Sequence, residues 1–351
     1  MADVVQQAHE LIADRLDDFH RCWYFGPRFQ YRPIVGYTSA PFKSKTLNIG
    51  EDGFRGGPFV MRSANRAPRV GCFGASSVMG IPNCADNETV SAQLARDLGC
   101  EVLNFGVPVY NSAREANAVL RGLLEFDLSV VVLTSGFNDF HTAAHGVIWD
   151  YEDIAGPSRE AFDLNREKPI WHIKRAWRAF MKSRSRPVTK DRRQYEKQMS
   201  QRRVARIFGA HSAPPIYDYA SRFFATHILV AADASARARV PFLFVAQANI
   251  YSTSKQLSAY EKAIKSELIE FGFDEERDAR IEEFSKHYRA AMRSVVAAVR
   301  ESGGAAIDAD DILSTAGARV DVFHDSCHLT AQGCFILAQA IRRELAILRK
   351  P

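Results

Sequence analysis

The chain has 351 residues, of which 46% are hydrophobic and 25% charged. This size and composition fit one large α/β domain or two smaller ones with a packed core, and they exclude wholesale disorder. The net charge of +5 is a local feature, because residues 166–206 hold fifteen Lys or Arg against three acids. A basic patch, and not a nucleic-acid-binding protein as a whole, is therefore expected.

The N-terminal segment lacks the basic start, apolar core and small-residue cleavage site of a signal peptide. It predicts an amphipathic helix with one apolar face, formed by Val4, Ala8, Leu11, Ile12, Leu16 and Phe19. No stretch approaches the roughly 18 apolar residues of a membrane span. We expect a cytoplasmic protein in which residues 1–69 form a helix and an irregular extension that packs on the core.

A strand–loop–helix rhythm begins at residue 70 and predicts a domain over residues 70–351. The expected strands are 70–74, 101–105, 129–135, 240–245 and 304–308, and the expected helices are 88–98, 112–124, 221–237, 280–301 and 330–348. Ser112 and Glu115 have the spacing of a capping box for the second helix. Alternating strands and helices predict a three-layer α/β/α sandwich around a mostly parallel five-stranded sheet. A basic helical insert at about 141–219 interrupts this alternation of strands and helices.

The first candidate for chemistry is the run Gly74-Ala75-Ser76-Ser77 after the first strand. A serine at a glycine-flanked turn from strand to helix is held out of the core. The same turn points backbone N–H groups at whatever the hydroxyl attacks. Ser76 is the expected nucleophile and Ser77 is the alternative. An ordinary Gly/Ser loop is the competing interpretation.

Two further segments end the second and third strands. Gly106 lets the backbone come close to a reacting centre and offers an N–H donor. Asn138 offers a side-chain amide to an oxyanion. Taken singly, each segment is more often a structural turn.

The fourth segment is Asp325-Ser326-Cys327-His328. At this spacing Asp325 can bind one ring nitrogen of His328 and leave the other nitrogen free to take a proton from a serine. A polar loop capping the last helix through Thr330 is the alternative. All four segments fall at the carboxyl ends of strands or in the loop before the last helix, where parallel sheets bind their ligands. Together they predict an active site.

The runs FGASSVMG, NFGVPVY, SGFNDF and FHDSCHLTAQG resemble the four sequence blocks of the SGNH/GDSL hydrolase family. The resemblance covers roughly residues 70–140 and 240–345, and it implies a flavodoxin-like fold. It also implies an esterase that needs no metal or cofactor. By resemblance, Ser76 is the nucleophile, His328 and Asp325 complete the triad, and Ser76, Gly106 and Asn138 form the oxyanion hole. The chain departs from the pattern at Ala75, where the family has Asp or Gly.

The expected reaction is hydrolysis of a carboxylic ester, with a short acyl group, on a small molecule or carbohydrate such as an O-acetylated sugar. An O-acyltransferase that passes the acyl group to a sugar hydroxyl is the first alternative. A non-catalytic binding module on the same fold is the second. No specific nucleic-acid partner is expected.

Several other features have less specific interpretations. The basic insert, including Lys174, Arg175 and Arg178, is either a solvated cap or a patch for an anionic substrate. Asp308, Asp310 and Asp311 could hold a metal, although turn or N-cap use is favoured. No ligand spacing joins the lone histidines His141, His145, His172, His211 and His287, which we expect to be surface or structural residues. The run DGFR at Asp52 to Arg55 is similar to an N-terminal stretch in relatives of unassigned substrate.

Overall fold

The computed structural model describes residues 10, 12–22, 29–32, 35–61, 68–145, 216–268, 270–271 and 275–348. The predicted patch at Lys174, Arg175 and Arg178 lies outside these residues, as do most of the predicted insert and the first half of the predicted N-terminal helix. The described part of that helix is α2 (Ala13–His20). No helix in the described part of the chain is both long enough and apolar enough to cross a membrane.

The core of the fold is a five-stranded sheet in which every pairing is parallel. Its strands are β5 (Arg69–Gly74), β6 (Glu101–Gly106), β7 (Val130–Ser135), β8 (Phe242–Ala246) and β9 (Ala305–Asp308). Their order across the sheet is β6-β5-β7-β8-β9. This is the flavodoxin-like order, with a switch point beside β5. The predicted fold class is therefore confirmed.

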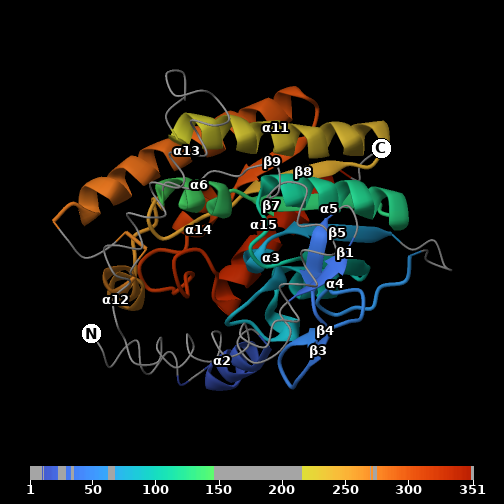
Figure 1. Cartoon of the computed structure of the whole chain (residues 1–351), viewed down its shortest axis with the longest axis horizontal. Coiled ribbons are helices and arrows are strands. Elements are labelled where there is room, and N and C mark those ends of the chain that lie inside the picture. Colours follow the sequence, from blue (N-terminus) through green and yellow to red (C-terminus); the bar gives the residue numbers. More distant parts are fainter. Residues whose placement is uncertain are drawn as a thin grey trace.

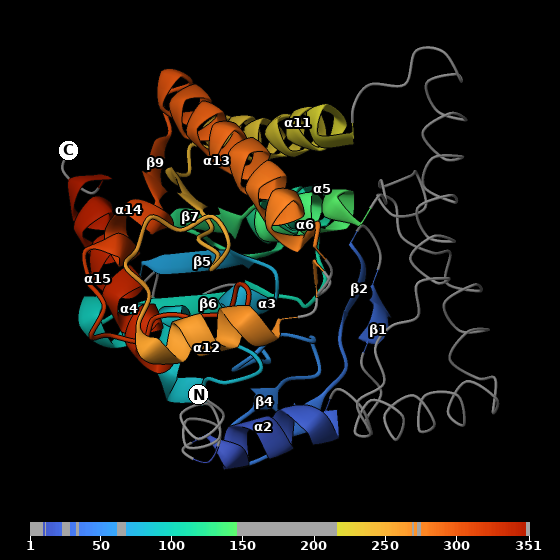
Figure 2. The same ribbon diagram turned by 90° about the vertical axis from the view of Figure 1, so that its left-hand side faces the viewer.

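Helices cover both faces of the sheet (Figures 1 and 2). One layer contains α5 (Ser112–Glu125), α6 (Phe137–Ala144), α11 (Ile216–Arg237) and α13 (Arg277–Glu301). The other contains α4 (Val90–Leu98), α14 (Ala309–Ser314) and α15 (Ala331–Leu348). Short elements lie at the carboxyl edge and in the connections: α3 (Ser76–Met79), the 3₁₀ helix η2 (Asp86–Glu88) and α12 (Ala259–Glu267).

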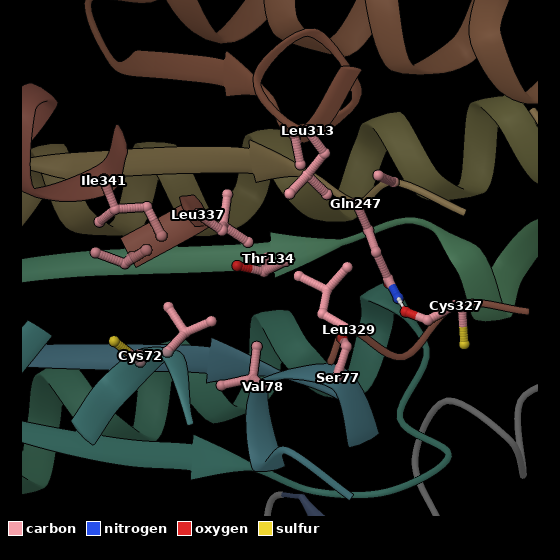
Figure 3. A pocket seen from close by; sticks show the side chains of 14 residues that line it. Cys72, Ser77, Val78, Thr134, Gln247, Leu313, Cys327, Leu329, Leu337 and Ile341 are labelled. Carbon is pink, nitrogen blue, oxygen red and sulfur yellow. Dashed lines mark hydrogen bonds between the residues drawn. The ribbon is translucent and has the colours of Figure 1, made fainter. Parts of the chain in front are cut away.

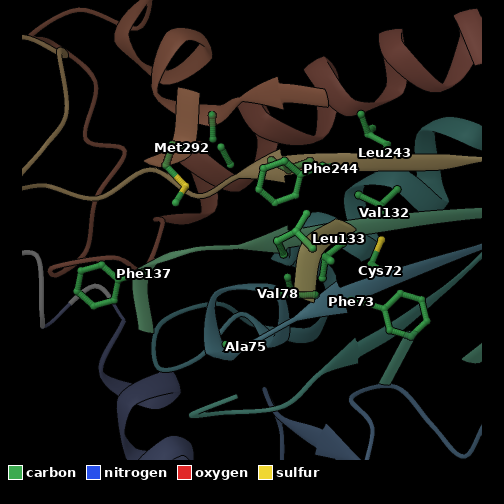
Figure 4. Packing of buried hydrophobic residues seen from close by; sticks show 14 of the residues in the cluster. Cys72, Phe73, Ala75, Val78, Val132, Leu133, Phe137, Leu243, Phe244 and Met292 are labelled. Carbon is green, nitrogen blue, oxygen red and sulfur yellow. The ribbon is translucent and has the colours of Figure 1, made fainter. Parts of the chain in front are cut away.

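The middle strands are buried along their whole length because both faces are covered. Phe73 of β5, Leu133 of β7 and Phe244 of β8 are fully buried, and Figure 4 shows them among the other core side chains. Each such side chain stabilises the fold by roughly 1.5–3 kcal/mol. The unbroken apolar run that predicted the third strand is explained by this double coverage.

The N-terminal extension forms two small hairpins and then joins the central sheet. Strand β1 (Phe29–Arg32) pairs with β2 (Gly36–Ser39), and β3 (Phe42–Lys43) pairs with β4 (Asn48–Ile49). Beyond β4, Arg55 makes β-bridges to Ile49 and to Asn104 of β6. The extension thereby covers an edge strand that would otherwise expose unpaired backbone groups. The domain boundary at residue 69 remains a prediction.

The predicted capping box of α5 was wrong by one residue. Asn111 is the N-cap, and its side chain accepts a hydrogen bond from Arg114 N at 3.0 Å. Ser112 Oγ instead donates to Asp139 at 2.8 Å, and Glu115 accepts from Ser135. Both predicted capping residues are recruited by tertiary partners, which sequence spacing does not reveal.

Among the helices that were not predicted, α6 and α12 have eight and nine residues, and the others are shorter. Helix α6 follows β7 directly, in a segment where a turn and the start of the insert were expected. Helix α12 begins with a capping box of its own, in which Ser258 Oγ accepts from Glu261 N and Glu261 accepts from Ser258 N. Its S-x-x-E signature was present in the sequence, but it precedes a helix of only nine residues.

Candidate active site

Ser76, His328 and Asp325 form one continuous line of hydrogen bonds at the carboxyl edge of the sheet. Nε2 of His328 lies 2.8 Å from Oγ of Ser76, and Nδ1 lies 2.7 Å from Oδ2 of Asp325. When Nδ1 carries the ring proton and donates it to the Asp325 carboxylate, Nε2 is unprotonated and accepts from the serine hydroxyl. The fold therefore brings together residues that are 252 positions apart in the chain.

The loop that carries His328 is shaped by Asp325 itself. Oδ1 of Asp325 accepts the backbone N–H groups of Cys327 at 3.0 Å and His328 at 2.8 Å. Its other oxygen, Oδ2, is left for the imidazole. The N–H of His324 then donates to the carbonyl of His328 at 2.8 Å. A three-residue spacing thus lets one carboxylate order the turn and orient the ring.

Electrostatics favour a basic imidazole. Burial opposes the charged form of His328, but the Asp325 carboxylate outweighs it and raises the pKa of His328 well above its usual value. Burial likewise opposes the charged form of Asp325, and the neighbouring His328 reverses that effect and lowers the Asp325 pKa. The pair therefore holds a carboxylate beside a ring that accepts a proton readily, which is what a general base requires.

The turn before Ser76 depends on a glycine. A Cβ at Gly74 would lie 2.4 Å from Val78 Cγ2 and 2.5 Å from the carbonyl oxygen of Thr134, so only glycine fits. Ala75 is the N-cap of α3, and its methyl group is buried in the main core. Ala75, at the position where the resembling family has Asp or Gly, thus packs its methyl group into the core.

The two candidate serines have different surroundings. Oγ of Ser76 is bonded to His328, whereas Oγ of Ser77 is buried with no hydrogen-bond partner. Ser77 instead lines a mostly apolar cavity below the turn, between the sheet and helices α14 and α15 (Figure 3). Cys327 and Leu329, on either side of His328, line the same cavity. The geometry favours Ser76 over Ser77 as the nucleophile.

Gly106 lies at the end of β6, tightly packed against α3. A Cβ there would be 2.3 Å from Met79 N, so the expected close backbone approach is present. Its N–H, however, donates to Oδ1 of Asn104 at 3.0 Å. The N–H that was predicted for the oxyanion hole is therefore already engaged in this structure.

Asn138 is the second residue of α6 and is partly exposed. Its Nδ2 donates to the carbonyl of Tyr110 at 2.7 Å. An amide nitrogen carries two hydrogens, so a second one remains for a ligand. Val109, next to Tyr110, has a φ of 67° and is 51% exposed. A left-handed backbone is rare for a β-branched residue, and such strain tends to occur at functional sites.

Two supporting residues were missed by sequence reasoning. Asn104, buried in β6, donates to Val78 O at 2.9 Å and to Ser91 Oγ at 2.8 Å, which ties α3 to the sheet. Glu261 of α12 accepts the N–H groups of Val322 and Phe323 at 2.8 and 3.1 Å, just before the His328 loop. An asparagine inside a predicted strand was a usable signal, because strands are depleted in asparagine.

Two of the residues interpreted as lone histidines are in fact paired. His141 and His145 lie one turn apart on or next to α6, and their Nε2 atoms are 3.2 Å apart. Burial, together with the neighbouring His145, lowers the pKa of His141 to about 3. His287 stacks on Tyr217 with ring centroids 4.6 Å apart. His172 and His211 lie outside the described residues.

Asp308, the last residue of β9, and Asp310, in the first turn of α14, accept hydrogen bonds from backbone and side-chain groups. Asp308 is the N-cap of α14 and accepts from Asp310 N at 2.9 Å. Asp310 accepts from Thr253 Oγ1 and from Ser254 N. These bonds agree with the favoured interpretation of Asp308 and Asp310 as turn or cap residues, and the role of Asp311 stays a prediction.

No protein-family model matches the chain, and no curated protein matches its sequence. Similar solved structures include GDSL-like lipases, SGNH hydrolases and acylhydrolases, the group whose sequence blocks this chain resembles. A lipolytic protein of the G-D-S-L family from Veillonella parvula is 11% identical, covering 81% of this chain and 100% of its own, with a TM-score of 0.43.

The lipase/acylhydrolase from Enterococcus faecalis is 15% identical over 81% of this chain and 98% of its own, with a TM-score of 0.40. A GDSL-like lipase from Bacteroides thetaiotaomicron is 8% identical over 80% and 88%, with a TM-score of 0.41.

Proposed function

We propose that this chain is a serine esterase with Ser76 as its nucleophile. The observation that carries the proposal is the line of hydrogen bonds from Asp325 through His328 to the Ser76 hydroxyl, with both distances below 3 Å. A serine hydroxyl is a weak nucleophile until an adjacent base takes its proton, and this arrangement supplies both the base and its orienting carboxylate.

The proposed reaction has two halves. Nε2 of His328 takes the Ser76 proton as Oγ attacks the ester carbonyl, and the imidazolium then protonates the leaving alcohol. Water repeats the sequence on the acyl-enzyme and releases the acid. Asp325 keeps Nδ1 protonated throughout and stabilises the positive ring. In this scheme the chain's own residues make every proton transfer.

The developing oxyanion needs hydrogen-bond donors, and the proposed set is the N–H of Ser76, the N–H of Gly106 and the free amide hydrogen of Asn138. Asn138 is supported by its position, since the bond to Tyr110 O fixes the amide and leaves one hydrogen for a ligand. Gly106 requires its bond to Asn104 to be shared or released. We therefore assign Asn138 the larger share of the stabilisation.

The proposed substrate is an ester with a short acyl group on a polar alcohol, such as an O-acetyl group on a carbohydrate. His328 and Asp325 keep 18% and 28% of their side chains exposed, so the reacting edge remains in contact with water. A sugar hydroxyl leaving group can stay hydrated at such an edge and loses little solvation on binding.

The test is a panel of esters, from acetyl to octanoyl and including acetylated sugars, assayed on the wild-type chain and on Ser76→Ala and Ser77→Ala. We expect Ser76→Ala to lower kcat by about 10⁴-fold or more. Ser77→Ala is the matched control, because it removes a neighbouring hydroxyl that lacks the imidazole partner. Wild-type rates in Ser76→Ala would refute the proposal.

Transfer of the acyl group to an added sugar, in preference to water, would show an acyltransferase.

A further inference from the structure

Arg55 is a buried arginine of the N-terminal extension whose five N–H donors are all satisfied. Its side chain is 2% exposed. Nε donates to Asp86 Oδ1 at 2.7 Å, and the other four bonds go to backbone carbonyls. A guanidinium has five N–H donors in a fixed fork, so this site uses its full capacity. Such a site recognises arginine and no other side chain.

Two of these bonds end on the helix that carries the nucleophile. Nη1 of Arg55 donates to Met79 O at 2.8 Å and to Gly80 O at 3.0 Å, which are the last carbonyls of the α3 turn. Nη2 donates to Thr46 O at 2.9 Å and to Cys84 O at 2.7 Å. One side chain therefore ties α3, the loop that follows it and the N-terminal extension together.

Helix α3 needs such support because it has only four residues, from Ser76 to Met79. A single helical turn has no stability of its own, and its final carbonyls have no partners within the helix. Asn104 holds the carbonyl of Val78, and Arg55 holds the next two. The end of α3 is thus fixed from outside, while Ser76 at its beginning faces His328.

The DGFR run explains how Arg55 reaches this position. Asp52 accepts the N–H groups of Phe54 at 3.2 Å and Phe59 at 2.7 Å, which closes a compact turn. Gly53 has a φ of 86°, and a Cβ there would lie 2.2 Å from Thr38 Oγ1, so the turn requires glycine. The backbone of Arg55 then forms a β-bridge with Asn104 on β6, and its side chain reaches the carboxyl end of α3.

We propose that Arg55 is a positioning residue for the nucleophile: its guanidinium fixes the carboxyl end of α3 and thereby holds Ser76 Oγ against His328. The consequence for catalysis depends on the esterase proposal, whereas the effect on α3 does not. The N-terminal extension is then part of the catalytic scaffold. Misplacement of a reacting atom by about 1 Å can cost about 10²-fold in rate.

The test compares Arg55→Lys with Arg69→Lys. Lysine keeps the charge at both sites and loses the planar fork. Arg69 is an equally buried arginine, also 2% exposed, which pairs with Glu101 at the opposite end of β5 from Ser76. We expect Arg55→Lys to slow fluorophosphonate labelling of Ser76 and to lower kcat by about 10²-fold, with KM nearly unchanged. Arg69→Lys should leave both rates within threefold of wild type, a limit of roughly 0.7 kcal/mol.

Hydrogen exchange supplies a readout that needs no activity. The amides of Met79 and Gly80 donate to Ala75 O and Ser76 O within α3, and we expect them to exchange about tenfold faster in Arg55→Lys only. Unchanged exchange in a folded Arg55→Lys would overturn the proposal, as would equal acceleration in Arg69→Lys. If exchange accelerates but the wild-type chain is never labelled, the esterase proposal fails and the positioning of α3 by Arg55 stands.

Discussion

At the scale of single residues, the site depends on a few polar contacts that sequence spacing predicted in part. The Asp325 and His328 pair followed from a three-residue spacing, because one carboxylate can serve both the turn and the ring. Gly106 was predicted as a donor, but its N–H is taken by Asn104 two residues earlier. Side-chain bonds of that kind depend on rotamers in the folded chain, which a linear pattern does not specify.

The raised pKa of His328 predicts how activity depends on pH. Only the neutral imidazole can accept the Ser76 proton, so kcat/KM should rise with pH through an apparent pKa above 6.5. Asp325→Asn removes the charge responsible for the shift. The rising limb should then move to lower pH, with a loss in kcat of about 10⁴-fold. A rising limb that stays in place in this variant would contradict the role given to Asp325.

Asn138 is expected to act in the transition state. Replacing it with alanine removes the amide hydrogen that is not used by Tyr110, and we expect kcat to fall by about 10²–10³-fold with little change in KM. Steady-state kinetics on a short-chain ester would measure both constants. A rise in KM at constant kcat would instead indicate a role in ground-state binding.

At the scale of elements, each half of the site is held in part by a segment outside the central sheet. Arg55 and Asn104 hold α3, and Glu261 of α12 holds the segment before His328. The sheet strands and long helices followed from apolar periodicity, since each buries a continuous face. Helix α12 did not, because its nine residues are defined by a cap and by buried polar bonds.

The ion pair between Lys255 and Glu261 should be important for stability. The two groups are 2.6 Å apart and both side chains are fully buried. Glu261→Gln leaves the lysine charge without a counter-ion, so we expect a loss of about 3–5 kcal/mol in the free energy of unfolding. The double variant with Lys255→Met should recover most of that loss. Urea unfolding measures both effects.

A surface pair provides the control for this prediction. Arg237 Nε and Asp233 Oδ2 are 2.7 Å apart, but their side chains are 79% and 62% exposed. Asp233→Asn should therefore cost less than about 1 kcal/mol. If Glu261→Gln lowered the free energy of unfolding no more than this exposed variant does, the buried pair would not stabilise the fold.

At the scale of the whole molecule, alternation of strands and helices was enough to predict the parallel sheet, and the resemblance of the four sequence blocks implied its flavodoxin-like class. Parallel strands require crossovers, and the crossovers here are long amphipathic helices with clear periodicity. The hairpins β1–β2 and β3–β4 were not predictable in detail, because their strands have only two to four residues. Strands this short contain too few residues to show an alternation of apolar and polar side chains.

Global stability should depend on two carboxyl groups buried behind the site. Burial raises the pKa of Asp139 to about 7 and that of Glu115 well above its usual value. The folded state holds the Asp139 proton more tightly than the unfolded chain, whose pKa is ~4. Its contribution to stability is therefore complete below pH ~4 and is lost as pH rises through about 7.

Asp139→Asn isolates this effect, since the amide oxygen can still accept from Ser112. The free energy of unfolding of the variant, relative to wild type, should increase by a few kcal/mol between pH 4 and pH 8. Urea unfolding of both chains across this range measures the difference. A difference that stays constant with pH would show that Asp139 is ionised throughout.

The most direct test of the esterase assignment is the site of the covalent intermediate. The chain is mixed with p-nitrophenyl acetate, quenched in acid within one turnover and analysed by peptide mass spectrometry. We predict one acetyl group on the peptide that contains Ser76, assigned to Ser76 by fragmentation and absent from Ser76→Ala. Hydrolysis that proceeds with the acetyl group on Ser77, or with full activity in Ser76→Ala, would contradict the assignment.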